Sequence, residues 1–150
     1  MVIRRPSGRI LLSIKTFYPR GAYRLPTGGI GHRERILDAL ARETEEETGL
    51  DTALRRFLAA ISYRDGAAPE GPPIFHTFAF LLDEIGGTLE TRDAEEQIEE
   101  WIEVEPAELS TVATRLERVT TAYSDEIGGR WSDWGRFRAI VHRVVADALA

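Results

Sequence analysis

The sequence contains no cysteine and no asparagine, and it has a single lysine, a single glutamine and a single methionine. The absence of cysteine excludes disulfide bridges, cysteine-ligated zinc and a thiol nucleophile. Apolar runs are short, such as residues 78–82, and none could span a bilayer. The charged first residues are not followed by an apolar stretch of signal-peptide length, so we expect a cytoplasmic protein without a membrane partner.

The chain is acidic, with a formal net charge of −6. A protein that binds nucleic acid in general normally carries a basic stripe, so this charge argues against a nucleic-acid partner. A small phosphate-bearing substrate stays compatible with it if something neutralises the local field. The length of 150 residues predicts one domain, covering residues 1–150.

Strand-like and helix-like segments alternate along the chain. Alternation and turn residues predict strands at 9–15, 23–25, 56–63, 74–82 and 101–104. The segment 74–82 is apolar on both faces apart from His76 and Thr77, which is typical of a central strand covered on both sides. Gly86 and Gly87 predict a turn.

Three helices complete the expected fold. The first covers residues 34–48 and ends at Gly49. Two amphipathic helices follow, with the apolar stripes Val112, Leu116, Val119 and Tyr123, and Phe137, Val141, Val144, Val145 and Ala148. Mixed strands and helices with one long early helix predict an α/β or α+β protein with a mixed sheet.

The first helix carries an acidic cluster. Glu43, Glu46 and Glu47 stand at i, i+3 and i+4 on one face, where each pair of like charges costs the helix a few tenths of a kcal/mol. A bound Mg²⁺ or Mn²⁺ would explain the cluster, whereas a solvated acidic face is the ordinary alternative. Beside the cluster runs a stripe that we expect to dock the helix on the sheet, formed by Ile36, Leu37, Leu40, Ala41 and Thr44.

The residues around the cluster favour the metal site. The segment 28–50 resembles the signature box of Nudix hydrolases, with matches at Gly28, Glu34, Arg42, Glu43, Glu46, Glu47, Gly49 and Leu50. Thr44 departs from the pattern, because the family has an aliphatic residue there, which puts packing in question more than chemistry. The preceding segment is similar to the family's Leu-Pro-Gly-Gly lead-in, with Thr27 as an extra residue.

The resemblance implies an α/β fold, a Nudix-type α/β/α sandwich with a mixed β-sheet. It also implies that Glu43, Glu46 and Glu47 are catalytic residues and the metal ligands, with Mg²⁺ as the cofactor and Mn²⁺ as a substitute. Glu34 and Arg42 are expected to form a structural ion pair that holds the loop and helix together.

The glycines before the helix have two interpretations. Gly28 and Gly29 permit a tight loop that brings backbone close to a bound ligand, and a plain turn into the helix explains them equally well.

The family often supplies another carboxylate from a later loop, as a further ligand or as a general base. The acidic stretch before Trp101 offers candidates, among which Glu100 is the first choice because it directly precedes an aromatic strand start. Glu96 and Glu99 follow, and solvated surface charge is the alternative for each of them.

The implied reaction is Mg²⁺-dependent hydrolysis of a diphosphate bond in a nucleoside diphosphate linked to another moiety. One alternative is a nucleoside triphosphate pyrophosphohydrolase that sanitises the nucleotide pool. The other is a non-catalytic nucleotide-binding sensor, which retention of all three glutamates disfavours. The expected partner is a small nucleotide-type molecule, and a homodimer is compatible with the resemblance.

The substrate itself is left open by the sequence. The lack of asparagine argues against an asparagine-read guanine. Arg20 and Arg24 flank the lead-in and are candidates to meet phosphate, while His76 and His142 suggest no ligand cluster. Candidates for stacking a base, each with a core role as the alternative, are Phe17, Tyr18, Tyr23, Trp101, Trp131 and Trp134.

Overall fold

The middle layer of the protein is a mixed five-stranded sheet. The structure is a computed structural model that describes residues 1–150, apart from the side chain at position 94. In the strand order β3-β4-β1-β2-β5, β1 and β4 run parallel and the other neighbours run antiparallel. The strands are β1 (Val2–Arg4), β2 (Ile10–Lys15), β3 (Leu50–Tyr63), β4 (Phe75–Gly87) and β5 (Ile98–Val104). A separate two-stranded ribbon pairs β6 (Tyr123–Ser124) with β7 (Gly129–Arg130).

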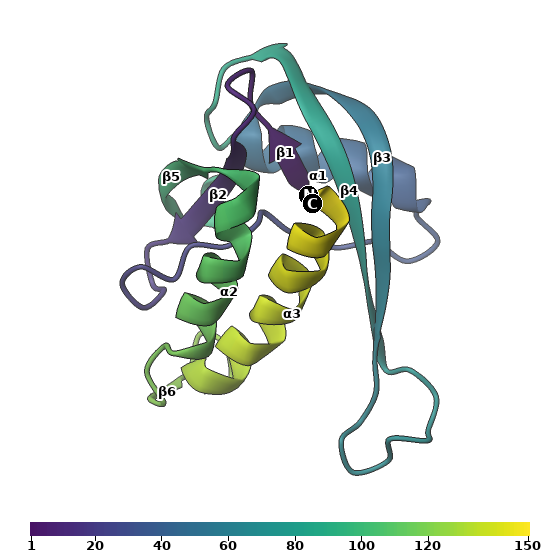
Figure 1. Cartoon of the computed structure of the whole chain (residues 1–150), viewed down its shortest axis with the longest axis vertical. Helices are drawn as coiled ribbons and strands as arrows, with labels where there is room; N and C mark the ends of the chain where they lie inside the picture. The colour runs from purple at the N-terminus through teal and green to yellow at the C-terminus, as the bar shows by residue number, and fades with distance from the viewer.

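Helices cover both faces of the sheet. Helix α1 (Ile36–Thr48) lies on one face, while α2 (Leu109–Glu117) and α3 (Trp131–Leu149) lie side by side on the other (Figure 1). Short 3₁₀ turns, η1 (Ala94–Glu96) and η2 (Pro106–Glu108), flank β5. This confirms the predicted α/β sandwich with a mixed sheet. In the described part of the chain, no helix combines the length and apolarity needed to cross a lipid bilayer.

The strand alternation divides the apolar side chains between two cores. Successive side chains of a strand point to opposite faces, so Val2 and Leu12 enter a large core while Ile3 and Leu11 enter a smaller one. The large core lies under α2 and α3 and includes Leu109, Val112, Leu116, Ala139, Val141 and Val145. The smaller core lies under α1, so the two central strands β1 and β2 are covered on both sides.

Helix α1 forms as predicted but docks on a different face. Gly49 ends it in the left-handed region at φ 64°, and its N–H donates to the Glu45 carbonyl at 2.9 Å. The expected docking stripe is wrong for three of its members, since Ile36, Leu37 and Ala41 are exposed. The buried side chains of the helix are instead Ala39, Thr44, Glu47 and Thr48.

Two threonines explain why this polar face can pack on the sheet. The Thr44 hydroxyl donates to the Leu40 carbonyl at 2.6 Å, and the Thr48 hydroxyl donates to the Thr44 carbonyl at 2.6 Å. A buried hydroxyl costs little when its hydrogen bond is made within the helix. Thr44 can therefore stand where the Nudix pattern has an aliphatic residue.

The strands differ from the prediction in three ways. Gly86 and Gly87 form no turn but pair with Asp51 and Leu50, which lengthens both strands. Segment 23–25 forms no strand, only an isolated bridge between Ser13 and Arg24. Strand β4 is central, between β3 and β1, but its first two residues, Phe75 and His76, are exposed, because the hairpin projects beyond the body of the protein (Figure 1).

One edge of β4 is paired only along part of its length. Strand β1 starts at Val2, opposite Leu81, so the first half of β4 has no strand beside it on that edge. The space there is bordered by the loop after Leu25 and by α3. Tyr123 does not extend the α2 stripe as predicted; it lies in β6 and is exposed, since α2 ends at Glu117.

Candidate functional site

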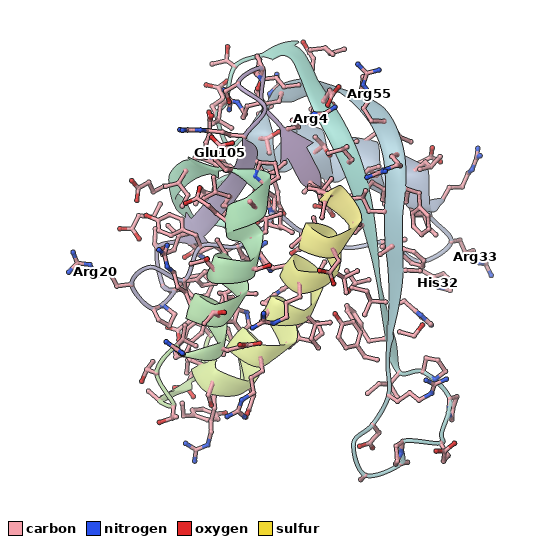
Figure 2. All side chains as sticks on the ribbon, in the orientation of Figure 1. Arg4, Arg20, His32, Arg33, Arg55 and Glu105 are labelled. Carbon is pink, nitrogen blue, oxygen red and sulfur yellow. The ribbon has the colours of Figure 1, made fainter. Side chains whose placement is uncertain are left out.

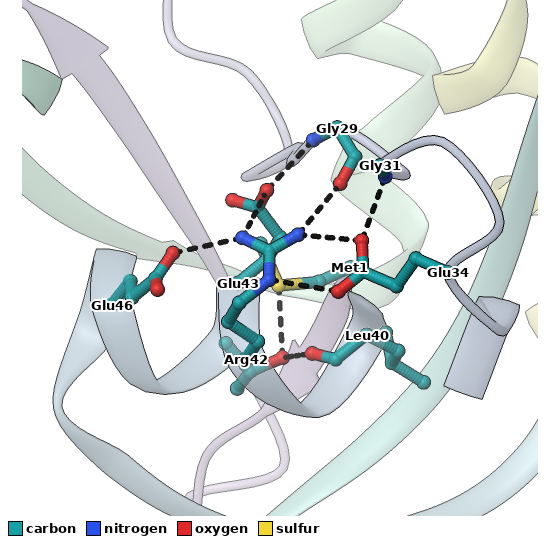
Figure 3. A network of polar contacts seen from close by, with 9 residues as sticks. Met1, Gly29, Gly31, Glu34, Leu40, Arg42, Glu43 and Glu46 are labelled. Carbon is teal, nitrogen blue, oxygen red and sulfur yellow. Dashed lines mark hydrogen bonds and ion pairs between the residues drawn. The ribbon is translucent and has the colours of Figure 1, made fainter. Parts of the chain in front are cut away.

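Arg42 of helix α1 binds three carboxylates, those of Glu34, Glu43 and Glu46 (Figure 3). Its guanidinium makes two hydrogen bonds to Glu34, both at 2.9 Å, which confirms the predicted ion pair. Its Nη1 also donates to Glu43 Oε1 at 2.9 Å and to Glu46 Oε2 at 3.0 Å. The hydrogen bonds from Arg42 and from the Gly31 N–H lower the pKa of Glu34 to about 2. One cation thus holds three carboxylates in place.

The glycine loop lies directly against Glu43. The N–H of Gly29 donates to Glu43 Oε1 at 3.0 Å, and the Gly29 carbonyl accepts from Arg42 at 3.1 Å. A Cβ at position 28 would lie 2.2 Å from Glu43 Cδ, so a side chain larger than hydrogen would displace the carboxylate. Gly28 is therefore needed for the close approach of backbone to Glu43.

Glu47 lies on the sheet-facing side of the same helix and is buried. Both of its carboxylate oxygens are inaccessible to water and have no hydrogen-bond partner. Burial raises its pKa to about 7, and the negative charge of Glu96 adds to this effect. The cations Arg24, Lys15 and the amino terminus act in the opposite direction without forming an ion pair. A buried carboxylate without a partner is costly, and a bound cation is one way to satisfy it.

The donors fit a hard divalent cation, although they are not gathered around one point. Among the described residues, no three His, Asp or Glu side chains are clustered closely enough to hold an ion. Glu43 and Glu46 are bonded to Arg42, while Glu47 points toward the sheet. Carboxylate oxygens are the donors that Mg²⁺ and Mn²⁺ prefer, and those of Glu47 are unsatisfied.

The later acidic stretch presents two different carboxylates. Glu100, the first choice from sequence, lies exposed on β5 and accepts a hydrogen bond from the Tyr23 hydroxyl. Glu96 is ion-paired with Lys15 at 2.8 Å, and its charge acts on Glu47. Of the carboxylates in this stretch, Glu96 is therefore the one that the structure couples to the acidic helix.

A cleft of about 450 Å³ opens beside the glycine loop. Its walls come from α1, the loop after Leu25, the first half of β4 and the middle of α3. The polar side chains at its surface include Thr27, Glu43 and Arg138, while the apolar ones include Ile36, Leu40, Phe78 and Val141. A cleft of this size with few polar groups is typical of small-molecule sites.

Two residues of α3 were not predicted to belong to the site. His142 accepts a hydrogen bond at Nε2 from the Leu25 N–H at 3.0 Å, and its Nδ1 lies 2.7 Å from the Arg138 carbonyl. Burial lowers the pKa of His142 to about 4, so the ring is neutral with its proton on Nδ1. No local pattern could reveal this contact, because the two segments are far apart in the sequence.

The residues proposed from sequence to contact phosphate or to stack a base lie outside the cleft lining. Arg20 is exposed and points away from the body of the protein, on the side opposite His32 and Arg33 (Figure 2). Arg24 is buried and bonded to neutral oxygens. The cleft-lining rings are instead Phe75, His76, Phe78 and Phe80.

The aromatic residues proposed to stack a base have packing partners of their own. Tyr18 lies 5.0 Å from Phe17, 5.6 Å from Trp131 and 4.7 Å from Trp134, measured between ring centroids. Trp101 packs against the smaller core, and none of these rings lines the cleft.

A three-layer α/β/α fold with an acidic helix and a glycine loop facing one cleft defines the class of protein. The sequence profile described as NUDIX domain matches residues 1–123, so the chain belongs to the Nudix family. Arg138 and His142 lie beyond the matched range.

Two curated relatives are similar in sequence. The NAD-capped RNA hydrolase NudC of Vibrio atlanticus is 30% identical over 120 residues, covering 77% of this chain and 42% of the relative. The ADP-ribose pyrophosphatase of Methanocaldococcus jannaschii is 30% identical over 100 residues, covering 65% of this chain and 56% of the relative. The chain thus matches about half the length of each of these relatives.

Solved structures show the same fold at lower identity. An ADP-ribose pyrophosphatase from Streptococcus suis has a TM-score of 0.55 and 16% identity, with 98% of this chain and 89% of the other covered. The MutT protein of Methanosarcina mazei has a TM-score of 0.53 and 17% identity, with 97% and 89% covered.

Proposed function

We propose that this protein is a divalent-cation-dependent hydrolase that cleaves the diphosphate bond of a nucleoside diphosphate linked to another moiety. The observation that carries the proposal is Glu47, a buried carboxylate without a partner, on the helix that also carries Glu46 and presents Glu43 to the cleft. Family membership supports the reaction class. The two curated relatives support the substrate class, because ADP-ribose and NAD both contain a nucleoside diphosphate.

In this proposal Glu43, Glu46 and Glu47 hold Mg²⁺, with Mn²⁺ as a substitute. A bound ion would neutralise phosphate oxygens and lower the pKa of a bound water. Arg42 fixes the positions of Glu43 and Glu46, and the Gly29 N–H orients Glu43 toward the loop. Gly28 and Gly29 let substrate phosphates approach this backbone closely.

A further carboxylate is proposed to accept the proton of the attacking water. Glu100 is the candidate from sequence, and Glu96 is the candidate favoured by its charge coupling to Glu47. Measuring kcat for E100Q and E96Q separates them, since the residue that accepts the proton should show the larger loss.

Two other functions make different predictions for the same assay. A nucleoside triphosphate pyrophosphohydrolase would prefer triphosphates, and a nucleotide-binding sensor would turn over none of the compounds. The cytoplasmic location, a homodimer and the lack of a nucleic-acid partner stay predictions, as does the single domain over residues 1–150. Comparing free NAD with NAD-capped RNA tests the nucleic-acid prediction directly.

The decisive experiment is a substrate panel with Mg²⁺, read by phosphate release after a coupled phosphatase. The panel contains ADP-ribose, NAD, nucleotide sugars, dinucleoside polyphosphates and nucleoside triphosphates. On the preferred substrate, E46Q should lose activity by roughly 100-fold or more, which corresponds to about 2.7 kcal/mol of transition-state stabilisation. The matched control is E45Q, because Glu45 is exposed on the same helix and paired only with Arg92. Unchanged turnover in E46Q would remove the catalytic assignment.

A further inference from the structure

Arg138 brings a positive charge into the cleft from a helix outside the signature segment. The residue lies in the middle of α3 and lines the cleft together with Thr27 and Glu43. Its Nε is inaccessible to water and has no hydrogen-bond partner. Its Nη1 lies 3.4 Å from Thr27 Oγ1, and its guanidinium carbon lies 5.3 Å from the ring centroid of Phe137. The donors of this arginine are therefore largely unused.

Arg138 is half-buried, and a second arginine that is fully buried lies near the same threonine. Arg24 is 2% exposed and donates to three neutral oxygens, those of the Tyr18 hydroxyl, the Leu25 carbonyl and the Thr27 hydroxyl. Among the described residues, neither Arg24 nor Arg138 has a carboxylate within ion-pair distance. Two guanidinium groups thus share one threonine hydroxyl, and the charge of the buried Glu47 acts on both of them without an ion-pair contact.

Arg138 keeps its charge in this environment. Burial lowers the pKa of Arg138, and the charge of Arg24 acts in the same direction. An arginine guanidinium nevertheless stays protonated at neutral pH. A protonated guanidinium that is partly withdrawn from water without an ion-pair partner is unfavourable, and an anionic ligand would relieve this cost.

The position of Arg138 relative to Glu43 suggests which anion this is. Thr27, which touches Arg138, is followed directly by Gly28, which touches Glu43. Adjacent residues of the loop therefore contact the glutamate end of the cleft and its arginine wall, which is formed by Arg138 and Thr27. Two linked phosphates have a matching arrangement, with one phosphate toward the glutamates and the other toward the arginine wall.

We propose that Arg138, supported by the Thr27 hydroxyl, binds the phosphate of the substrate that lies farther from the glutamates. Arg138 thereby makes the cleft selective for two linked phosphates over one. This inference rests on the proposed function, because it takes the diphosphate to be the group held between the two ends of the cleft. A planar guanidinium can form two parallel hydrogen bonds to phosphate oxygens, which a single lysine-type donor cannot.

His142 fixes the backbone that presents this arginine. Its neutral ring donates from Nδ1 to the Arg138 carbonyl and accepts at Nε2 from the Leu25 N–H. The ring thereby ties the turn of α3 that carries Arg138 to the loop that carries Thr27. His142 thus holds Arg138 and Thr27 in place relative to each other, although it does not line the cleft itself.

Binding without hydrolysis tests the inference. The probes are ADP-ribose with a methylene bridge between its two phosphorus atoms, and AMP as the single-phosphate comparison, both titrated by calorimetry with Mg²⁺. We expect R138Q to weaken binding of the bridged analogue by roughly 10-fold or more and to leave AMP within about 2-fold. R138K should lie between R138Q and the wild type, because it keeps the charge but loses the two-bond geometry.

The control variant is R136Q, since Arg136 is on the same helix, exposed and paired only with Asp133. It should match the wild type for both probes. T27V, which removes only the shared hydroxyl, should weaken the analogue by a few-fold and provides a second test if R138Q does not fold. Equal binding of the analogue by wild type, R138Q and T27V would overturn the inference.

Kinetics separate this inference from the proposed function. On a hydrolysed substrate, R138Q should raise KM by roughly 10-fold with a smaller change in kcat. If the wild type hydrolyses nothing in the panel but loses analogue binding in R138Q, the proposed function fails and the binding role stands. If hydrolysis is normal in both proteins and KM is unchanged, the binding role alone is wrong.

Discussion

His142 accepts a hydrogen bond at Nε2 from the backbone N–H of Leu25, 117 residues earlier in the chain, at 3.0 Å. This bond joins the last helix to the loop that enters the glycine segment of the cleft. A protonated imidazole has no acceptor nitrogen, so the contact exists only while the ring is neutral. The geometry of one wall of the cleft therefore depends on a histidine that must not take up a proton.

The first prediction concerns stability against acid. His142 has a pKa of about 4 in the folded protein, against about 6.5 for an exposed histidine. Because the unfolded state binds the proton more tightly, its contribution to stability is present above pH 6.5 and is lost as the pH falls toward 4. The full effect is up to about 3 kcal/mol. Denaturant unfolding of wild type and H142Q at pH 7, 5.5 and 4.5 should show their stability difference shrinking.

The control for this measurement is H32Q, because His32 is exposed. Its stability should follow that of the wild type at every pH. Parallel curves for wild type and H142Q across the range would contradict the role given to the buried ring.

The second prediction compares two adjacent glycines. A Cβ at position 28 would fall 2.2 Å from Glu43 Cδ, whereas one at position 29 would meet nothing within 4 Å. G28A should displace the Glu43 carboxylate and lower kcat by roughly 10-fold or more, since small misplacements of reacting groups are costly. G29A should retain most of the activity, because the backbone N–H that bonds Glu43 is kept.

Melting temperatures provide the control for this pair. The atoms displaced in G28A are the end of a flexible side chain, so stability should change little. Equal activity of G28A and G29A would show that the position of Glu43 does not matter to the reaction.

The third prediction separates stability from metal binding at Glu47. Replacing this unpartnered buried carboxylate by an amide should stabilise the metal-free protein by about 1 kcal/mol or more at pH 8, because an uncompensated buried charge is removed. The same E47Q variant should lose the rise in Tm that Mg²⁺ gives the wild type. Scanning calorimetry with and without Mg²⁺ measures both effects. A less stable E47Q that kept its Mg²⁺ response would refute the role of Glu47 as a ligand.

The fourth prediction concerns the packing of α2 against α3. A Cβ at Gly135 would lie 2.0 Å from the Leu116 carbonyl oxygen, so the two helices approach more closely there than any side chain allows. G135A should therefore destabilise the protein by about 1–3 kcal/mol, although alanine normally favours a helix over glycine. The Tm should fall by several degrees. G66A is the control, since nothing lies within 4 Å of a Cβ there, and an equally large fall in that variant would contradict the explanation.

Local features of the chain were predictable because their causes are local. The periodicity before Gly49 and the glycine itself predicted the first helix, and Arg42 lies only eight positions after its partner Glu34. The turn residues before β2 and its apolar run likewise predicted its span to within one residue. Each of these predictions depends on residues that are neighbours along the chain.

Features that depend on distant packing were not predictable. Ile36 belongs to an apolar stripe by spacing, but it is exposed and lines the cleft instead of the core. In the sequence, nothing distinguishes Arg138 and His142 from other residues of an amphipathic helix. The place of Arg138 in the cleft and the bond of His142 to Leu25 follow from how α3 packs on the sheet, which no single segment encodes.

The projecting β3–β4 hairpin has a practical consequence for work on this protein. Its tip, residues 64–73, is rich in glycine, alanine and proline, and it extends away from the layers that hold the cores (Figure 1). Exposed tips of this kind tolerate added sequence better than packed elements do. A fluorescent or affinity module inserted there would report on the molecule while leaving the helix of glutamates and the last helix undisturbed.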